Sequence, residues 1–247
     1  MVTDDDAEAD FELLRSSTGK ILPCVHNAFT LFKRADQFAD VHFDTFLHRM
    51  RVGPRDWIDA DGLDALRWIQ VTFRVASFTL AHVTSAMLSL AYTRKHDSLV
   101  EFVDALPLWD NIPRIDQAFS DAWGADDTEL HRQASRNFFI ALIARARHPG
   151  AQVDTLWVFE GPQGSFKSRA LRALGGPLHA EISAAIGTTD FQRELRGIWI
   201  AELSELESLR GKEASTIKRL LSTPADRFVE KYAVHAESYP RRAVCGQ

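Results

Sequence analysis

The sequence of 247 residues has few of the features that mark secreted, membrane-spanning or metal-binding proteins. Its two cysteines, Cys24 and Cys245, cannot build a disulfide framework or a CxxC zinc site, and free thiols suit a reducing cytoplasm. The nine histidines show no metal-ligand spacing. The most apolar stretch, residues 71–92, is interrupted by an arginine, a histidine and several hydroxyl residues, so we expect buried helices and no membrane span.

Positive charge is not in excess either. Lys and Arg number 29 against 34 Asp and Glu, and the acids of residues 1–10 account for the whole net charge of −5. This acidic start is the opposite of the basic start of a secretory signal. From Phe11 onward the charges balance, which excludes a globally basic nucleic-acid binder but leaves a local basic site open. A DNA-binding module without ATPase activity has little support, because no basic–aromatic interleaving is present.

The first part of the chain predicts a short tail and then helices. Residues 1–10 predict a disordered acidic tail, and residues 11–105 predict a mainly helical lead-in domain. After a break at Asp61–Gly62, apolar residues recur three and four positions apart and indicate the core faces of helices that end near Lys95–His96. The loop at 106–114, with its prolines, is the candidate boundary. The residues of the core faces are Leu63, Leu66, Ile69, Phe73, Val83, Met87, Leu90 and Ala91.

The second part, residues 106–247, alternates helices with short apolar strands. A helix capped by Asp127 or Thr128 and stopped at His148 precedes this change of pattern. The fold class is therefore α/β, with a short, incomplete parallel sheet, and an edge strand left exposed by that sheet favours self-association. In chain order we expect a buried strand at 155–159, a helix at 168–174, a capping box of Thr189 and Gln192 before a helix at 190–195, a strand at 198–201, a helix at 214–221 and a strand at 242–245.

The strand at 155–159 runs into a glycine-rich loop and then into a helix, which is the arrangement that binds a triphosphate. Lys167 would reach the β and γ phosphates, and the Ser168 hydroxyl would bind Mg²⁺. In the pattern GxxxxGK[ST] a glycine precedes the lysine, where the chain is tight or φ is positive, and Phe166 tolerates such a position poorly. A strand–turn–helix corner with an accidental Lys-Ser is the alternative. The loop residues are Gly161, Pro162, Gln163, Gly164, Ser165, Phe166, Lys167 and Ser168.

A pair of acids supports the interpretation of the loop. Glu202 and Glu205 follow the strand at 198–201. In a magnesium-dependent nucleotide hydrolase, one such carboxylate orients the water shell of the metal and another polarises the attacking water. Many strands end in a glutamate on a solvated loop, so these two acids indicate a nucleotide site only in combination with the phosphate loop that precedes them.

In this order, the motifs resemble the virulence-associated protein E family, the helicase-like P-loop ATPases of phages and mobile elements, which are often joined to a primase. The similarity extends over 105–247, and an ordered set of motifs is far more specific than any one of them. The matching segments are 108–116 (the family's WDGxPRID segment), 159–172 (its nucleotide loop and following helix), 195–206 (its acidic strand), and 217–222, 226–228 and 239–242 (its downstream blocks).

The resemblance implies a RecA- or AAA+-like P-loop NTPase core that hydrolyses ATP with Mg²⁺. It also implies a ring-like homo-oligomer that acts on DNA, single-stranded or forked, during replication of the element. Lys167 and Ser168 would hold phosphate and metal, and Glu202 or Glu205 would serve the metal and the attacking water. For three further residues the resemblance implies DNA contact or an arginine finger that reaches a neighbour's γ-phosphate, with solvated surface charges as the alternative: Lys218, Arg241 and Arg242.

Two departures separate the chain from the family pattern. Phe166 replaces the loop glycine, and the sequence stops at Gln247, where relatives continue into a Thr-Thr-Asn segment that senses the γ-phosphate. A primase region is also missing from this sequence. We therefore expect one of two proteins. The first is a helicase-class ATPase of a prophage or mobile element, with its core truncated at the C-terminus. The second is a degenerate P-loop remnant that binds nucleotide weakly or binds only protein partners.

Overall fold

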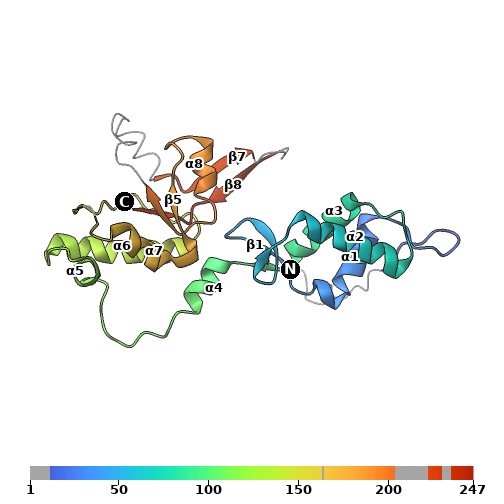
Figure 1. The fold of residues 1–247 in the computed structure, drawn as a ribbon, viewed down its shortest axis with the longest axis horizontal. Coiled ribbons are helices and arrows are strands. Elements are labelled where there is room, and N and C mark those ends of the chain that lie inside the picture. The colour runs from blue at the N-terminus through green and yellow to red at the C-terminus, as the bar shows by residue number, and fades with distance from the viewer. Residues whose placement is uncertain (1–11, 163, 204–221, 230–234, 247) are drawn as a thin grey trace, which may run out of the picture. The chain divides into compact units, whose positions relative to one another are not determined.

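The chain has a mixed α/β fold, as predicted, with eight α-helices and several small sheets among its described residues. The computed structural model describes residues 12–162, 164–203, 222–229 and 235–246 (Figure 1). The predicted acidic tail at 1–10 and the predicted helix at 214–221 lie outside the described residues. None of the described helices has both the length and the apolar character that crossing a bilayer demands.

Two compact units make up the chain, Met1–His96 and Asp97–Gln247. The division precedes the predicted boundary loop at 106–114. The reason is that α4 (Ser98–Asp104) packs against α6 (Glu129–Arg147), so this short helix belongs to the second unit.

The first unit packs three helices against a small sheet. Phe32, Phe38, Ile69, Met87 and Leu90 lie in its hydrophobic core. Its helices are α1 (Val25–Lys33), α2 (Asp59–Phe73) and α3 (Leu80–Thr93), with a 3-10 turn, η2 (Asp36–Phe38). Its strands, in the sheet order β3-β2-β1-β4, are β3 (Arg55–Asp56), β2 (Arg49–Val52), β1 (Val41–Asp44) and β4 (Lys95–His96).

The helical pattern of this unit is predicted well for α3 and less well elsewhere. All four of the core residues predicted on α3 are buried. The predicted break at Asp61–Gly62 is wrong, because the Asp61 carboxylate accepts from the N–H of Ile58 at 2.8 Å and so stabilises the first turn of α2. Ile69 is buried and Leu66 and Phe73 pack against the core, so the predicted core face of α2 is wrong only at Leu63, which is 56% exposed. α3 ends at Thr93, two residues before the predicted Lys95–His96, which pairs with β1.

The second unit contains more helices and two sheets. Its helices are α4, α5 (Ala118–Trp123), α6, α7 (Lys167–Gly175) and α8 (Thr189–Glu194), with a 3-10 turn, η3 (Gly176–Leu178). Its strands are β5 (His179–Ile182), β6 (Ile200–Leu203), β7 (Ala225–Val229), β8 (Ala236–Pro240) and β9 (Val244–Gly246). β7 and β8 form an antiparallel hairpin, and the other three strands form a parallel sheet.

Threonine side chains fix where two of these helices begin. The Thr128 hydroxyl accepts from the N–H of His131 at 3.3 Å. Of the two caps predicted for α6, Asp127 or Thr128, the second is therefore confirmed. The helix ends at the predicted residue, His148. At α8 the hydroxyl of Thr188 accepts from Phe191 N–H at 3.2 Å. The capping box predicted at Thr189 is therefore wrong by one residue.

The parallel sheet has a strand order that differs from the chain order. β5 pairs with β6, β6 pairs with β9, and Trp157 forms a parallel bridge with Gly246 of β9. β9, the last of these four segments in the chain, therefore lies between the Trp157 segment, which is the first, and β6, which is the third. The strand predicted at 155–159 reduces to this bridge, and those predicted at 198–201 and 242–245 begin two residues later than expected.

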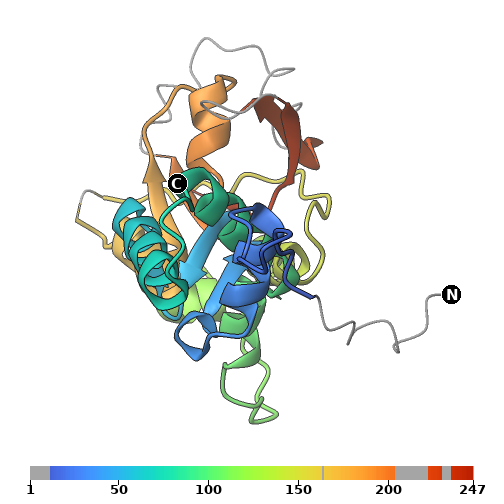
Figure 2. The same ribbon diagram turned by 90° about the vertical axis from the view of Figure 1, so that its right-hand side faces the viewer.

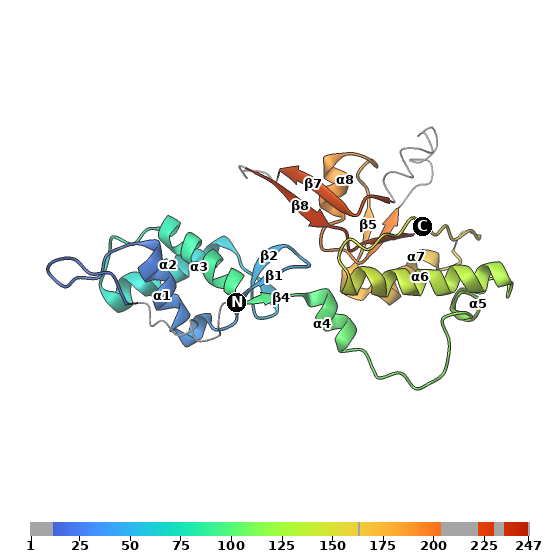
Figure 3. The same cartoon turned by 180° about the vertical axis from the view of Figure 1, so that it is seen from behind.

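Helices pack on both faces of this sheet (Figure 2, Figure 3). α7 covers one face so closely that a methyl group added to Gly175 would lie 2.8 Å from Cβ of His179. α8 covers the other face, where Phe191 packs in one cluster with Ala201 and Leu203. Because side chains alternate along a strand, Glu202 faces the α7 side. The segment that follows Trp157, the N-terminus of α7 and this glutamate thus belong to the same side of the sheet.

Candidate functional site

The loop after the Trp157 bridge leads directly into the first turn of α7. Lys167 is the first helical residue, and Phe166 is the N-cap, with φ 60° and ψ 21°. The N–H of Ala170 donates to the Phe166 carbonyl at 2.9 Å, which closes the first turn. The N–H groups at the start of a helix have no partner inside it and point toward an incoming anion. The loop therefore places Lys167 and exposed Ser168 at the start of α7, where an anion could be bound.

Phe166 has the left-handed backbone that the glycine of the pattern would adopt. Its φ is positive, as the pattern predicts, and its side chain is 68% exposed. The ring lies 5.6 Å from the guanidinium of Arg169 and does not enter the core. A non-glycine residue in this region carries strain of about 1–2 kcal/mol, because Cβ approaches the carbonyl oxygen. The loop thus keeps its fold at a local energetic cost.

The loop at 161–168 is closed on itself. Lys167 Nζ donates to the Gly161 carbonyl at 2.9 Å, and the N–H of Ser165 donates to the Pro162 carbonyl at 3.2 Å. A Cβ added to Gly161 would lie 3.1 Å from Ser165 Oγ, so a larger residue there requires the serine side chain to shift by a few tenths of an ångström. Gly164 supplies a further positive φ of 86°. Gln163 lies outside the described residues.

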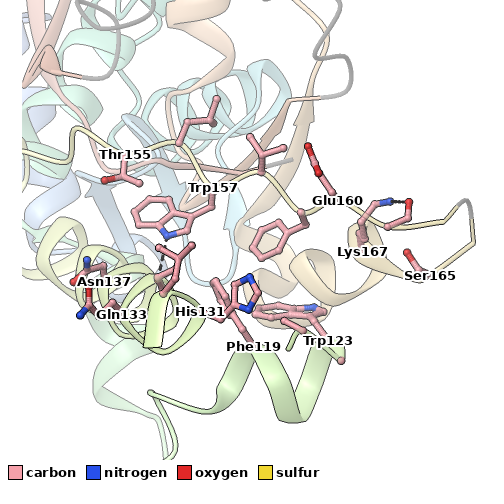
Figure 4. Close-up of a pocket in the computed structure, with 18 of the residues that line it drawn as sticks. Phe119, Trp123, His131, Gln133, Asn137, Thr155, Trp157, Glu160, Ser165 and Lys167 are labelled. Carbon is pink, nitrogen blue, oxygen red and sulfur yellow. Dashed lines mark hydrogen bonds between the residues drawn. The ribbon is translucent and has the colours of Figure 1, made fainter. Parts of the chain in front are cut away.

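A cavity of about 700 Å³ adjoins the loop (Figure 4). Figure 4 shows Lys167 and Ser165 at one end and Gln133 and Asn137 at the other, with aromatic side chains between them. The walls come from α5, α6 and the segment from Thr155 to Pro162. The aromatic and imidazole side chains that line it are Phe119, Trp123, His131, Trp157 and Phe159.

Glu202 is buried and already has a partner. Its Oε2 lies 3.0 Å from Nε2 of His179, on the neighbouring strand β5, with both side chains less than a tenth exposed. In the sheet register Glu202 is level with Gly246, which is level with Trp157. Two strand spacings, about 10 Å, therefore separate Glu202 from the bridge that precedes the loop. The glutamate leans toward β5, on the side away from β9. Glu205 lies outside the described residues.

Arg241 and Arg242 are held in buried ion pairs. Arg241 donates from Nε and Nη2 to the two carboxylate oxygens of Asp226, each at 2.6 Å. Arg242 binds Asp97 in the same bidentate manner, at 2.7 and 3.0 Å, and donates to the Ala146 carbonyl at 2.8 Å. Neither arginine lines the cavity, and neither is a solvated surface charge. Lys218, the third candidate of this group, lies outside the described residues.

The segment that resembles WDGxPRID folds around one carboxylate. Asp110 accepts from the N–H of Ile112 at 3.1 Å and from both terminal nitrogens of Arg114, at 2.8 and 2.6 Å. These hydrogen bonds, that of Arg114 foremost, lower the pKa of Asp110 to about 2. Asn111 stands where the pattern has glycine, and its φ is 65°. The motif therefore specifies a turn, with asparagine in a backbone region that it tolerates better than most residues.

Sequence reasoning missed the partners that decide these roles. The aromatic wall of the cavity was accessible in part, since Phe119 and Trp123 stand four residues apart, on one face of a helix. His179 gave no signal, because only the register of β5 on β6 brings it to Glu202. Asp97 and Asp226, far from the arginines in the chain, gave none either.

Other chemistry is not evident in the described residues. They contain no group of three or more His, Cys, Asp and Glu side chains that could hold a metal ion. Cys24 and Cys245 are free thiols, and burial raises the pKa of Cys245. The loop and the cavity are therefore the best-developed candidate site.

Comparison with known proteins bears on this site. The family model described as the virulence-associated protein E-like domain matches residues 103–247, which is more than half of the chain and includes the loop, the cavity and Glu202. The resemblance drawn from the ordered motifs is thereby confirmed. No curated protein matches the chain.

Replacing Phe166 tests whether its backbone is strained. Phe166→Gly is expected to raise the free energy of unfolding by about 1 kcal/mol, because glycine has no Cβ to clash in the left-handed region. Phe166→Ala is the matched control, since it removes the ring and keeps Cβ. Urea unfolding measures both. Equal stability of the two variants would show that φ at this position carries no strain.

Arg241→Ala separates a structural role from a catalytic one. Removing this partner leaves Asp226 buried and unpaired, so the free energy of unfolding is expected to fall by about 3–5 kcal/mol. The double variant Arg241→Ala/Asp226→Ala is expected to regain part of that loss. Denaturant titration provides the measurement. Unchanged stability in Arg241→Ala, with ATP hydrolysis abolished, would contradict the structural assignment.

Proposed function

Because the chain belongs to the virulence-associated protein E-like family of phages and mobile elements, we propose that it is a P-loop ATPase of the helicase class. In this proposal it acts on DNA, single-stranded or forked, during replication of the element. The observation that carries it is the loop at 161–168, which ends at the first turn of α7 with Lys167 beside a cavity. In parallel sheets, ligands bind outside the carboxyl ends of the strands, where this loop begins.

Phosphate binding follows from the groups at the loop. The unpartnered N–H groups at the start of α7 and the Lys167 ammonium supply positive potential at one point. Lys167 now donates to the neutral carbonyl of Gly161. A phosphate oxygen would replace that neutral acceptor with an anionic one, which adds the attraction between opposite charges to the hydrogen bond. The closed loop therefore has a partner that an anion can displace.

Two oxygen donors fit the magnesium ion of such a nucleotide complex. The exposed Ser168 hydroxyl and the Glu202 carboxylate are hard ligands of the kind that Mg²⁺ takes, and the bound ion would neutralise phosphate charge. Glu202 faces the α7 side of the sheet, and because its hydrogen bond to His179 uses Oε2, the other carboxylate oxygen would serve a metal or a water while that contact persists. Glu205 stays a candidate for the second carboxylate.

The assembly is part of the same proposal. A ring-like homo-oligomer and a primase as partner rest on family membership alone. The arginine that would reach a neighbour's γ-phosphate is not assigned to Arg241 or Arg242, because each would have to leave its carboxylate partner, buried Asp226 or half-buried Asp97.

A degenerate P-loop that binds nucleotide weakly is the second candidate. The strained backbone of Phe166 favours it, because strain opposes the loop conformation that would bind the nucleotide. The hydrogen bond between Glu202 and His179 favours it too, because it uses one oxygen of the carboxylate that would serve the metal or the water. Binding and hydrolysis measured separately distinguish the two candidates.

Mg-ATP binding to the purified chain tests the phosphate loop. We expect a Kd in the micromolar range, about −8 kcal/mol, by titration calorimetry. Lys167→Ala is expected to abolish this binding, and Lys20→Ala, which removes an exposed lysine of the first unit, is expected to leave it unchanged. Absence of binding in the unaltered chain would overturn the function.

Glu202→Gln separates binding from chemistry. The amide cannot act as a base or as an anionic metal ligand, so hydrolysis is expected to fall by about 100-fold or more while ATP binding persists. Glu181→Gln is the matched control, because Glu181 is the exposed register partner of Glu202 on β5. Phosphate release in single-turnover assays measures both. Equal rates for the two variants would remove Glu202 from the mechanism.

A further inference from the structure

The cavity beside the loop has more aromatic surface than phosphate binding needs. Phe119 and Trp157 are about 5% exposed and form its packed layer. Trp123 and Phe159, whose ring centroids are 5.2 Å apart, are only partly buried and line the cavity, as does His131. Partly exposed rings on a packed aromatic layer form a rigid apolar wall, in which the planes of Trp123 and Phe159 are inclined by 45°. A planar heteroaromatic ring can therefore stack on one of the two rings and contact the other with its edge.

The supporting layer is built from ring contacts among elements far apart in the chain. Phe119 of α5 contacts Phe159 with centroids 5.3 Å apart, and Phe138 of α6 contacts Trp157 at 5.2 Å. Trp157 Nε1 donates to the Ala134 carbonyl at 3.2 Å, which fixes the indole against α6. The stacking wall is therefore held by the same segment that leads into the phosphate loop.

Amide side chains line the end of the cavity away from the loop. Gln133 and Asn137 are four residues apart on α6, so they share one face of the helix. Gln133 Nε2 donates to Glu129 at 2.9 Å, which leaves its carbonyl oxygen to accept from a ligand. An amide offers a donor and an acceptor together, which matches the edge of adenine, whereas guanine is read by Arg or Lys. The described residues that line the cavity include no arginine, and the one lysine among them, Lys167, lies at the phosphate end.

The geometry points to an adenine-binding pocket: we propose that the cavity takes the base of the nucleotide whose phosphates the loop binds. Trp123 stacks on the base, Phe159 contacts it at an angle, and Asn137 and Gln133 read its edge. This inference rests on the proposed nucleotide-binding function. A volume of about 700 Å³ suits a ligand with a base at one end and phosphates at the other.

Binding of three probes, each with Mg²⁺, tests the pocket: ATP, GTP and inorganic tripolyphosphate, which has no base. The chain is expected to bind ATP at least about 10-fold more tightly than the other two. Trp123→Ala is expected to reduce ATP affinity to that of tripolyphosphate and to leave tripolyphosphate affinity unchanged. Trp123→Phe, which keeps a stacking ring, is expected to retain most of the ATP affinity. Trp109→Ala is the matched control, because Trp109 is 69% exposed and does not line the cavity.

Asn137→Ala tests the edge of the base without disturbing the core, since Asn137 is exposed. It is expected to narrow the preference for ATP over GTP. If Trp123→Ala binds none of the three probes, the Asn137→Ala variant decides whether the pocket binds adenine. An unchanged preference of that variant for ATP over GTP overturns the pocket.

Two outcomes overturn the pocket and leave the proposed function intact. One is equal affinity of the chain for ATP and tripolyphosphate, and the other is unaltered ATP affinity in Trp123→Ala. Failure of the unaltered chain to bind both ATP and tripolyphosphate overturns the function and the pocket together.

Discussion

The candidate site depends on the position of β9 between the Trp157 segment and β6. This strand joins the segment that leads into the phosphate loop to the strand that carries Glu202. Buried polar contacts hold the chain just before it. Arg145 donates to the Ala243 carbonyl at 3.1 Å, and Arg241 and Arg242 bind buried or half-buried carboxylates. Because breaking a buried ion pair leaves an uncompensated charge, these contacts fix β9 strongly.

Three helices of the second unit, α6, α7 and α8, could be predicted closely, since their signals are local, whereas no helix was predicted at α4 or α5. Caps, apolar periodicity and terminal glycines gave α6 and α7 to within a residue or two. The strands were harder, because they are three to five residues long and two began two residues late. In the first unit the small sheet was missed entirely, since strands of four residues or fewer leave no alternation to recognise. Pairing order is a tertiary property that periodicity does not contain.

For the candidate site, the sequence identified which residues to consider more readily than their burial and their partners. The loop could be predicted, and so could the positive φ at Phe166, because the pattern itself encodes a backbone shape. The roles considered for Arg241 and Arg242 took account of charge only. Their carboxylate partners lie 15 and 145 residues away in the chain, and burial by those partners changes what an arginine can do. The cavity could not be predicted from the sequence, because its walls come together only when the helices pack.

Two glycine positions of the family pattern hold side chains in this chain, and they differ in consequence. Asparagine tolerates a positive φ, so the turn at Asn111 carries little strain. Phenylalanine tolerates it poorly, so Phe166 carries more strain. In population terms, strain of about 1–2 kcal/mol at Phe166 favours competing loop conformers by roughly 5- to 30-fold relative to glycine. A ligand that selects only the observed conformer loses apparent affinity in proportion to that occupancy. In the proposed site, the strain at Phe166, which does not line the cavity, would therefore raise the ligand concentration needed to fill it.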